Sequence, residues 1–152
     1  MSGGFDDNIA RHVSVAFRHQ TALMNRWLEP LGLGAGQYRY LFLLYAADGR
    51  RLSELAETML IDKGAVSRAV AKLETNGYVE KRGEEADGRA SRVWLTPKGR
   101  RVRPVLRQRV EELIALLTGA LTPEEGETLA RLMGKVAAAA VAGMEGASRP
   151  NG

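Results

Sequence analysis

Apolar residues recur at helical spacing between residues 52 and 77, and the rest of the chain is best interpreted around this stretch. The pattern predicts two short helices, because residues three and four apart share one face of a helix. The first helix is predicted to begin at the N-cap residue Ser53, and the second follows the N-cap residue Asp62. Only residues 60–62 separate the helices, and Gly77 ends the second one where a left-handed C-cap is favoured.

The pattern changes from helical spacing to alternation after the second helix. Residues 78–82 and 92–95 alternate loosely, as strands do, and Asp87-Gly88 between them is typical of a hairpin turn. Thr96-Pro97 then opens a further helix, with an N-cap residue followed by Pro at the first helical position. The order of helix, turn, helix and charged hairpin predicts a winged helix-turn-helix, within a fold that is mostly α with a small β-wing.

Two further helices are predicted before this motif. The first spans residues 5–29 and has one apolar face, and Pro30 and the glycines after it end it. The second spans residues 35–47 and is apolar nearly all round, so we expect it to be buried.

Two helices are also predicted after the hairpin. Residues 97–117 form one that is basic at its start, and Pro104 should kink it or disturb its first turn. Residues 122–125 form a capping box that opens the last helix. The apolar stripe of that helix consists of Leu129, Leu132, Met133, Val136 and Ala140.

Composition limits the classes of protein that the chain can belong to. Of its 152 residues 45% are apolar, but no run approaches the roughly 20 apolar residues of a membrane span. The N-terminal residues lack the basic and apolar regions of a signal peptide, so we expect a cytoplasmic protein without a membrane partner. Without cysteine, disulfides, thiolate zinc sites and thiol-based sensing are excluded, and we expect no cofactor.

Basic residues concentrate on the winged segment and the helix after it. Residues 50–110 carry 15 Lys and Arg against 8 Asp and Glu, whereas the rest of the chain carries 7 against 10. An ordinary solvated surface would also explain this bias. Together with the helix-turn-helix pattern, however, it favours double-stranded DNA as a partner.

Four phrases occur in register along the winged segment. They are residues 62–68 (DKGAVSR), residues 73–79 (LETNGYV), Asp87-Gly88-Arg89, and residues 95–99 (LTPKG). Together they resemble the MarR family of winged-helix transcription regulators, and the order of the flanking helices fits as well. One departure is the acidic pair Glu84-Glu85, because such wings are often more basic.

The resemblance implies an assembly as well as a fold. The amphipathic terminal helices need a partner surface; they could pack onto their own domain, but the resemblance implies a second subunit. A homodimer would present two recognition helices to a pseudo-palindromic operator. A short third strand at residues 50–52 is also implied. The expected organisation is a disordered N-terminus (1–4), a dimerisation and effector helix (5–34), the DNA-binding domain (35–97), C-terminal dimerisation helices (98–143) and a disordered tail (144–152).

The exposed face of the second motif helix carries small residues and hydrogen-bond donors, which suit close approach to a major groove. A merely solvated face is the alternative. Arg89 is expected to enter the minor groove from the wing, oriented by an ion pair with Asp87. The predicted DNA-contacting residues are Ser53, Lys63, Gly64, Ala65, Ser67, Arg68, Lys72, Arg82, Asp87, Arg89 and Arg92.

The resemblance further implies an effector pocket between the dimer helices and the winged core. Aromatic residues at helical spacing are more often simply core. His12 and His19 lie seven residues apart, too far to chelate one metal ion, so we expect no metal site. The candidate ligand-binding residues are His12, Phe17, His19, Trp27, Tyr38 and Tyr45.

Three classes of function compete. The leading hypothesis is a homodimeric transcriptional repressor that binds a specific DNA sequence and is released by a small anionic or aromatic ligand. The alternative is a winged-helix protein-interaction module without specific DNA binding, which Lys63, Arg68 and Lys72 disfavour. We do not expect an enzyme, because the chain has no cysteine, no G-x-S-x-G motif and no nucleotide-binding glycine loop.

The wing residue Arg89 gives the first testable prediction. Arg89→Ala should weaken operator binding at least several-fold, because it removes a minor-groove contact, while the thermal unfolding temperature stays near that of the wild type. Unchanged affinity in a gel-shift titration would remove Arg89 from the DNA-contacting set.

Overall fold

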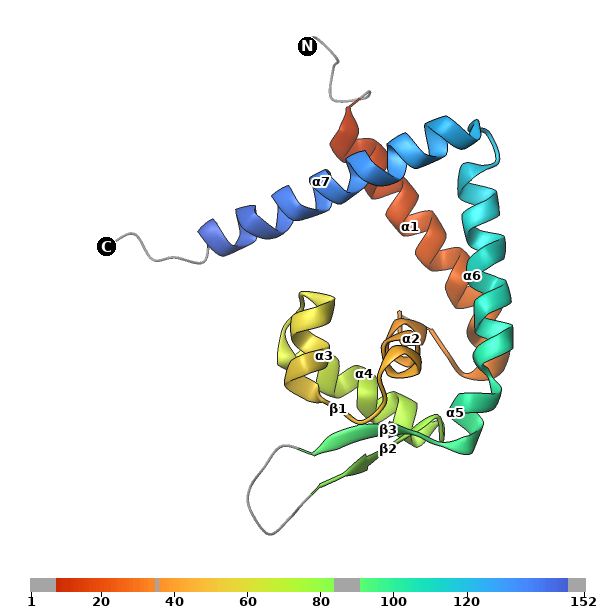
Figure 1. Cartoon of the computed structure of the whole chain (residues 1–152), viewed down its shortest axis with the longest axis vertical. Helices are drawn as coiled ribbons and strands as arrows, with labels where there is room; N and C mark the ends of the chain where they lie inside the picture. The colour runs from red at the N-terminus through yellow and green to blue at the C-terminus, as the bar shows by residue number, and fades with distance from the viewer. Residues whose placement is uncertain (1–7, 35, 84–90, 148–152) are drawn as a thin grey trace. The chain divides into compact units, whose positions relative to one another are not determined.

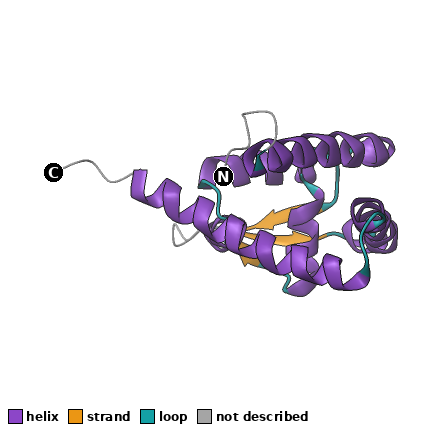
Figure 2. Ribbon diagram, turned by 90° about the horizontal axis from the view of Figure 1, so that it is seen from above, coloured by secondary structure: helices purple, strands orange, loops and turns teal. Residues whose placement is uncertain are grey.

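The computed structural model describes residues 8–34, 36–83 and 91–147, and it is mostly helical with one small antiparallel sheet (Figures 1 and 2). The predicted fold class is therefore confirmed. The chain divides into two compact units, the first ending at Leu113 and the second beginning at Ile114. Within the described ranges, no helix combines the length and the apolar character that crossing a bilayer requires. The elements are α1 (Ile9–Leu28), the 3-10 helix η1 (Glu29–Leu31), α2 (Tyr38–Ala46), β1 (Arg50–Arg51), α3 (Leu52–Met59), α4 (Lys63–Thr75), β2 (Val79–Arg82), β3 (Arg92–Leu95), α5 (Pro97–Arg101), α6 (Arg103–Thr118) and α7 (Pro123–Ala147).

Helix α1 begins later than its apolar pattern predicts. Asn8 has an extended backbone and caps the helix, and its Oδ1 accepts a hydrogen bond from the N–H of Arg11 at 3.0 Å. The predicted start at Phe5 is therefore wrong, and Phe5 itself lies outside the described residues, as do residues 1–4. At the other end, Pro30 lies in the short η1 that follows the helix, as a helix-ending residue should.

Helix α2 is shorter than predicted but is buried as expected. It begins at Tyr38 rather than at residue 35, because Gly36 has a φ of 78° that cannot continue an α-helix. Its residues Tyr40, Leu41 and Leu44 are buried and belong to the hydrophobic core.

Helix α3 begins one residue before the predicted N-cap. The cap is Arg51, which has an extended backbone, and the Glu54 carboxylate accepts its N–H at 2.6 Å. The prediction of Ser53 as the N-cap is therefore wrong. The Glu54 side chain bonds to the N–H of Arg51, so the cap lies two residues before Ser53. Ser53 lies instead in the first turn of α3.

The predicted connection between the motif helices is confirmed at residues 60–62. Leu60 has a left-handed φ of 56° and ends α3, and the N–H of Ile61 bonds to the carbonyl of Ala56 at 3.2 Å. Asp62 then caps α4 as predicted, since its Oδ1 accepts the N–H of Ala65 at 2.8 Å.

Gly77 ends α4 in the predicted left-handed conformation, with a φ of 76°. The N–H groups of Gly77 and Tyr78 bond to the carbonyls of Glu74 and Leu73, each at 2.9 Å. This pair of bonds is a Schellman motif, and it turns the chain directly from the motif into the sheet.

The sheet has the strand order β1-β3-β2, with both pairs antiparallel. The expected third strand is confirmed at Arg50–Arg51, while Leu52 already belongs to α3. The predicted Asp87-Gly88 turn falls within residues 84–90, outside the described residues, so it stays a prediction.

The sheet meets α5 through a close backbone contact. Thr96 caps α5 as predicted, and Gly99 lies so near that a Cβ added to it would be 2.1 Å from the carbonyl oxygen of Tyr78. The hydroxyl of Tyr45 donates to the Gly99 carbonyl at 2.6 Å. Burial, opposed by the charge of Arg103, raises the pKa of Tyr45 to about 12, so this donor keeps its proton at neutral pH.

The predicted disturbance at Pro104 takes the form of a break between two helices. Helix α5 ends at Arg101 and α6 begins at Arg103, with Val102 between them. Pro104 lacks an N–H group, so it cannot continue the hydrogen-bond ladder of α5. Of the described residues 103–118, Leu106 and Leu113 are the ones that α6 buries.

Helix α7 opens with the predicted capping box. The N–H of Thr122 donates to Glu125, and the N–H of Glu125 donates to the Thr122 hydroxyl. The helix continues to Ala147, so the prediction of a disordered tail from residue 144 is wrong for 144–147; residues 148–152 lie outside the described residues. Its stripe residues Leu129, Leu132 and Met133 are 44%, 45% and 38% exposed, so much of their apolar surface faces solvent.

The close contact at Gly99 gives a prediction about stability. Gly99→Ala should lower the free energy of unfolding by about 1–3 kcal/mol, because the added methyl group forces the Tyr78 carbonyl and α5 apart. Urea denaturation followed by circular dichroism measures the change.

Gly134→Ala is the matched control for this substitution. Nothing lies within 4 Å of a Cβ at Gly134, which is interior to α7, so the change should stabilise the protein by about 0.5–1 kcal/mol through helix propensity. Equal unfolding free energies for Gly99→Ala and the wild type would contradict the packing argument.

Candidate nucleic-acid interface

Helix α4 is seated on the core by one face and leaves the other open. Val66, Val70 and Leu73 are fully buried, which fixes the rotation of the helix about its own axis. The predicted residues on the opposite side are two that are partly buried, Ala65 and Ser67, and four that are exposed, Lys63, Gly64, Arg68 and Lys72. The sequence therefore placed the buried and open faces of this helix correctly.

The three cations of the open face have no carboxylate partner within the described part of the chain: no ion pair within 4.0 Å is formed by Lys63, Arg68 or Lys72. By contrast, Arg100 pairs with Asp48 at 2.6 Å. Unpaired cations can meet phosphates or guanine edges without first breaking an internal ion pair.

Gly64 leaves space in the first turn of α4 for two neighbouring polar side chains. A Cβ at this position would lie 3.0 Å from Oδ1 of Asp62 and 3.6 Å from Nη1 of Arg68. The Arg68 guanidinium therefore lies beside the helix N-terminus, next to the place that a Gly64 side chain would occupy. This arrangement allows a DNA backbone or base edge to approach the helix closely.

Two predicted phosphate contacts come from the sheet. Arg82 and Arg92 lie directly opposite each other in the β2–β3 register. Arg82 pairs with Glu80 and lies 5.5 Å from the ring centroid of Trp94. Nη1 of Arg92 donates to the Gly49 carbonyl at 2.8 Å. Both guanidinium groups thus already make contacts within the protein. A phosphate would bind to their remaining N–H donors.

The other predicted DNA contacts are spread more widely. Ser53 is partly buried in the first turn of α3. Asp87 and Arg89 fall outside the described residues, so their ion pair and the minor-groove contact stay predictions.

The six predicted ligand-binding residues do not form one site. Phe17 and Tyr38 line a small cavity of about 130 Å³ with Thr21, whose buried hydroxyl oxygen has no hydrogen-bond partner among the described residues. Tyr45 is bonded to α5, and Trp27 lies under the guanidinium of Arg109 at 5.8 Å.

The two histidines lie outside this cavity. His12 and His19 are both exposed on α1, and Nδ1 of His19 is 2.9 Å from the carbonyl of Val15. Across the described ranges, no three His, Asp or Glu side chains are close enough to hold a metal ion.

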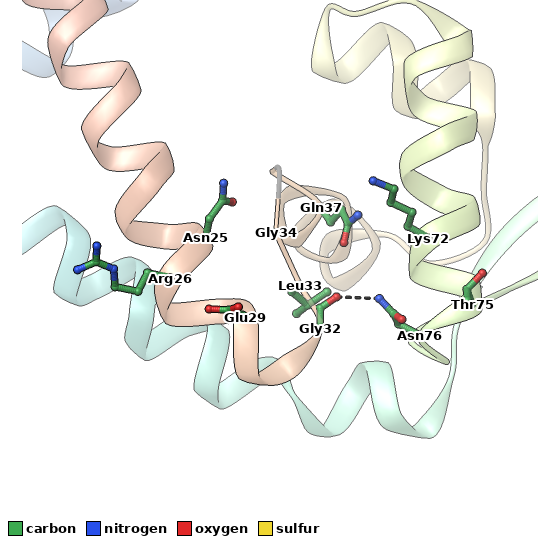
Figure 3. Close-up of a pocket in the computed structure, with 10 residues that line it drawn as sticks. All are labelled: Asn25, Arg26, Glu29, Gly32, Leu33, Gly34, Gln37, Lys72, Thr75 and Asn76. Atoms are coloured by element: carbon green, nitrogen blue, oxygen red, sulfur yellow. Dashed lines mark hydrogen bonds between the residues drawn. The ribbon is translucent and has the colours of Figure 1, made fainter.

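A larger groove lies between α1, the segment after η1, and the end of α4. Its volume is about 650 Å³, and Figure 3 shows Asn25 and Lys72 extending toward the open space while Arg26 points away from it. Nδ2 of Asn76 donates to the Gly32 carbonyl at 2.7 Å and ties the last turn of α4 to this segment. The lining residues are Asn25, Arg26, Glu29, Gly32, Leu33, Gly34, Gln37, Lys72, Thr75 and Asn76.

Of this lining, only Lys72 was predicted as a functional residue. The strongest omission is Gln37, which is 6% exposed and is the one buried polar residue of the described ranges. In the sequence, Gln37 stands out only as a single amide side chain just before an apolar helix. Its burial beside a groove depends on segments that are distant in the chain, so periodicity alone could not predict it.

Comparison with known proteins places these observations in a family. Residues 31–90 match the model of the MarR family. The uncharacterized HTH-type transcriptional regulator YybA of Bacillus subtilis (strain 168) is 31% identical over 130 residues, covering 86% of this chain and 87% of the relative. The multiple antibiotic resistance protein MarR of Salmonella typhimurium is 30% identical over 129 residues, covering 84% and 90%.

A solved structure agrees with the fold. The putative MarR family transcriptional regulator from Listeria monocytogenes, solved in complex with a 26mer DNA, superposes with a TM-score of 0.83 at 24% identity and covers 96% of this chain and 97% of that one. These relatives are transcriptional regulators rather than enzymes. The extent of the similarity, together with the winged helix-turn-helix and its basic recognition helix, shows that this chain belongs to the MarR family of DNA-binding transcriptional regulators.

Proposed function

We propose that the protein is a cytoplasmic homodimeric repressor that binds a pseudo-palindromic operator and is released by a small anionic or aromatic ligand. The observation that carries the DNA-binding part is the exposed face of α4, where Lys63, Arg68 and Lys72 have no ion-pair partner among the described residues. The Listeria relative solved with DNA supports the same part.

Arg68 is the proposed base-reading residue, and the other cations are proposed phosphate contacts. A guanidinium can bind O6 and N7 of guanine at once, which discriminates against other bases by about 1–3 kcal/mol. Lys63 and Lys72 carry point charges that suit phosphates better than bases. Ser53, Ser67, Arg82 and Arg92 are proposed to add contacts to the backbone.

The exposed apolar stripe of α7 supports the homodimer. Leu129, Leu132 and Met133 expose between 38% and 45% of their surface, and Ile114 and Leu116 of α6 expose 54% and 60%. A stripe of this kind is unfavourable in water unless another surface covers it. A two-fold partner would cover it with the same stripe and would set two α4 helices about 34–36 Å apart.

The alternative of a protein-interaction module remains in competition for the open face of α4. A module that binds an acidic protein segment would also use unpaired cations. The small residues Gly64 and Ala65 favour DNA, because they add little bulk between the helix backbone and the edge of a groove.

Arg68→Ala tests the DNA-binding proposal. It should weaken operator binding by about 10- to 100-fold, corresponding to about 1–3 kcal/mol, and relax specificity at one base pair in each half-site. The measurement is fluorescence anisotropy with DNA upstream of the protein's own gene, or with DNA from a random-site selection, at several salt concentrations.

Arg107→Ala is the control for the loss of one positive charge. Arg107 is exposed and pairs with Glu111 on α6, so its removal should leave operator affinity within about twofold of the wild type. An equal loss of operator affinity in Arg68→Ala and Arg107→Ala would mean that only the overall charge matters. Wild-type binding that does not depend on the DNA sequence would favour the protein-interaction module.

Leu132→Glu tests the homodimer. Sedimentation equilibrium of the wild type should give about twice the chain mass of 16.6 kDa, and the variant should shift toward the monomer because it places a carboxylate in the stripe. Ala138→Glu adds the same charge on the opposite side of α7, at 100° per residue, and should leave the dimer intact. A monomeric wild type would overturn the proposal.

A further inference from the structure

Leu60, in the turn between α3 and α4, combines two unfavourable features. Its φ of 56° and ψ of 42° place it in the left-handed region, which a branched side chain rarely adopts. Elsewhere in the described ranges, every residue with a φ in this region is a glycine. The side chain is also 65% exposed, so its burial does little to compensate for the backbone conformation.

The turn explains the conformation of Leu60 but not the choice of its side chain. A left-handed residue ends α3, and the N–H of Leu60 bonds to the carbonyl of Glu57 at 3.3 Å. Glycine or asparagine would make the same turn with less strain. A strained conformation that brings little packing in return is typical of residues with a function. Single exposed apolar residues are common on protein surfaces, so the position of Leu60 decides what this function is.

Leu60 lies at the end of α4 that carries the guanidinium of Arg68. It precedes the N-cap residue Asp62 by two positions, so the two Cα atoms are at most about 7 Å apart. Oδ1 of Asp62 and Nη1 of Arg68 lie 3.0 and 3.6 Å from the place of a Cβ on Gly64. The exposed cation Lys63 is the first residue of the same helix. An apolar side chain and two cations therefore share one end of the recognition helix.

The major groove of DNA offers one kind of apolar group to such a side chain. The base edges present hydrogen-bond donors and acceptors there, and thymine adds a methyl group at C5. Successive base pairs are about 3.4 Å apart, so a residue near the guanidinium of Arg68 can reach base pairs next to the one that Arg68 contacts. A leucine side chain against a thymine methyl removes apolar surface of both groups from water.

We propose that Leu60 reads the C5 methyl group of a thymine within about three base pairs of the guanine that Arg68 contacts. The proposal rests on the function proposed above, because it requires α4 to lie in the major groove of an operator. It assigns part of the sequence specificity to a residue that precedes the recognition helix. Because the contact is uncharged, it adds to specificity without adding to the salt dependence of binding.

Removal of the methyl group from the DNA is the direct test. The operator comes from a random-site selection with the wild type, and the guanine is located by the loss of specificity in Arg68→Ala. Each thymine of one half-site is then replaced by uracil, which lacks only the C5 methyl group. The wild type should bind one of these duplexes about threefold to fivefold more weakly in a competition measured by fluorescence anisotropy. Unchanged affinity at every position, or an operator without thymine within three base pairs of the guanine, would overturn the proposal.

Leu60→Gly completes a double-mutant cycle with the DNA methyl group. This variant should bind the thymine operator about as weakly as the wild type binds the sensitive uracil duplex, and it should lose nothing further with uracil. Its unfolding temperature should equal or exceed that of the wild type, because glycine adopts a left-handed conformation without strain. Leu60→Met keeps an apolar side chain and should still distinguish thymine from uracil. Equal sensitivity of Leu60→Gly and the wild type to uracil would assign the methyl group to another residue and overturn the proposal.

The salt dependence separates a lost methyl contact from a displaced helix. Leu60→Gly should keep the wild-type slope of log affinity against log salt concentration, whereas Lys63→Ala should reduce this slope by about one. Val105→Ala is the control for a shortened apolar side chain, since Val105 is 42% exposed on α6, and it should keep both operator affinity and sensitivity to uracil. A smaller slope in Leu60→Gly would mean that phosphate contacts are lost, which would contradict a contact to the methyl group alone.

Failure of this proposal and failure of the proposed function give different results. Specific operator binding that does not respond to uracil refutes the role of Leu60 and leaves the regulator standing. Wild-type binding that is equal for all DNA sequences refutes the proposed function, and the methyl contact with it.

Discussion

Tyr78 is the residue on which the arrangement of the DNA-binding unit depends. Its backbone N–H bonds to the carbonyl of Leu73 and closes the cap of α4, and its carbonyl accepts the N–H of Thr96 at the start of α5. Its buried ring ends in a hydroxyl that donates to the carbonyl of Leu31, and burial raises the pKa of this phenol so that it stays protonated. The side chain and peptide groups of Tyr78 thus join α4, the sheet, α5 and η1. The Tyr78 carbonyl also lies so close to α5 that position 99 has space for glycine but not for a Cβ.

This joint explains how a short helix can keep one fixed orientation. Helix α4 has 13 residues, and a helix of that length is marginal by itself. Its position comes from the buried residues Val66 and Val70, from the Asp62 cap and from the Schellman motif at Gly77. Because these contacts occupy one face and both ends, the open face can carry unpaired cations at the cost of little stability. Rigid seating of this kind reduces the entropy that a helix would otherwise lose on binding a partner.

The sequence predicted the elements whose signals are local. Asp62, Gly77, Thr96 and the capping box at residues 122–125 each cap a helix end, and each lies where the pattern indicated. The wrong predictions concern helix starts. Glu54 accepts the N–H of Arg51, so α3 is capped at Arg51 and not at Ser53. Asn8 caps α1, so this helix begins after Asn8 although the apolar pattern reaches back to Phe5. The groove could not be predicted at all, because Gly32 and Asn76 lie 44 positions apart and meet only through the fold.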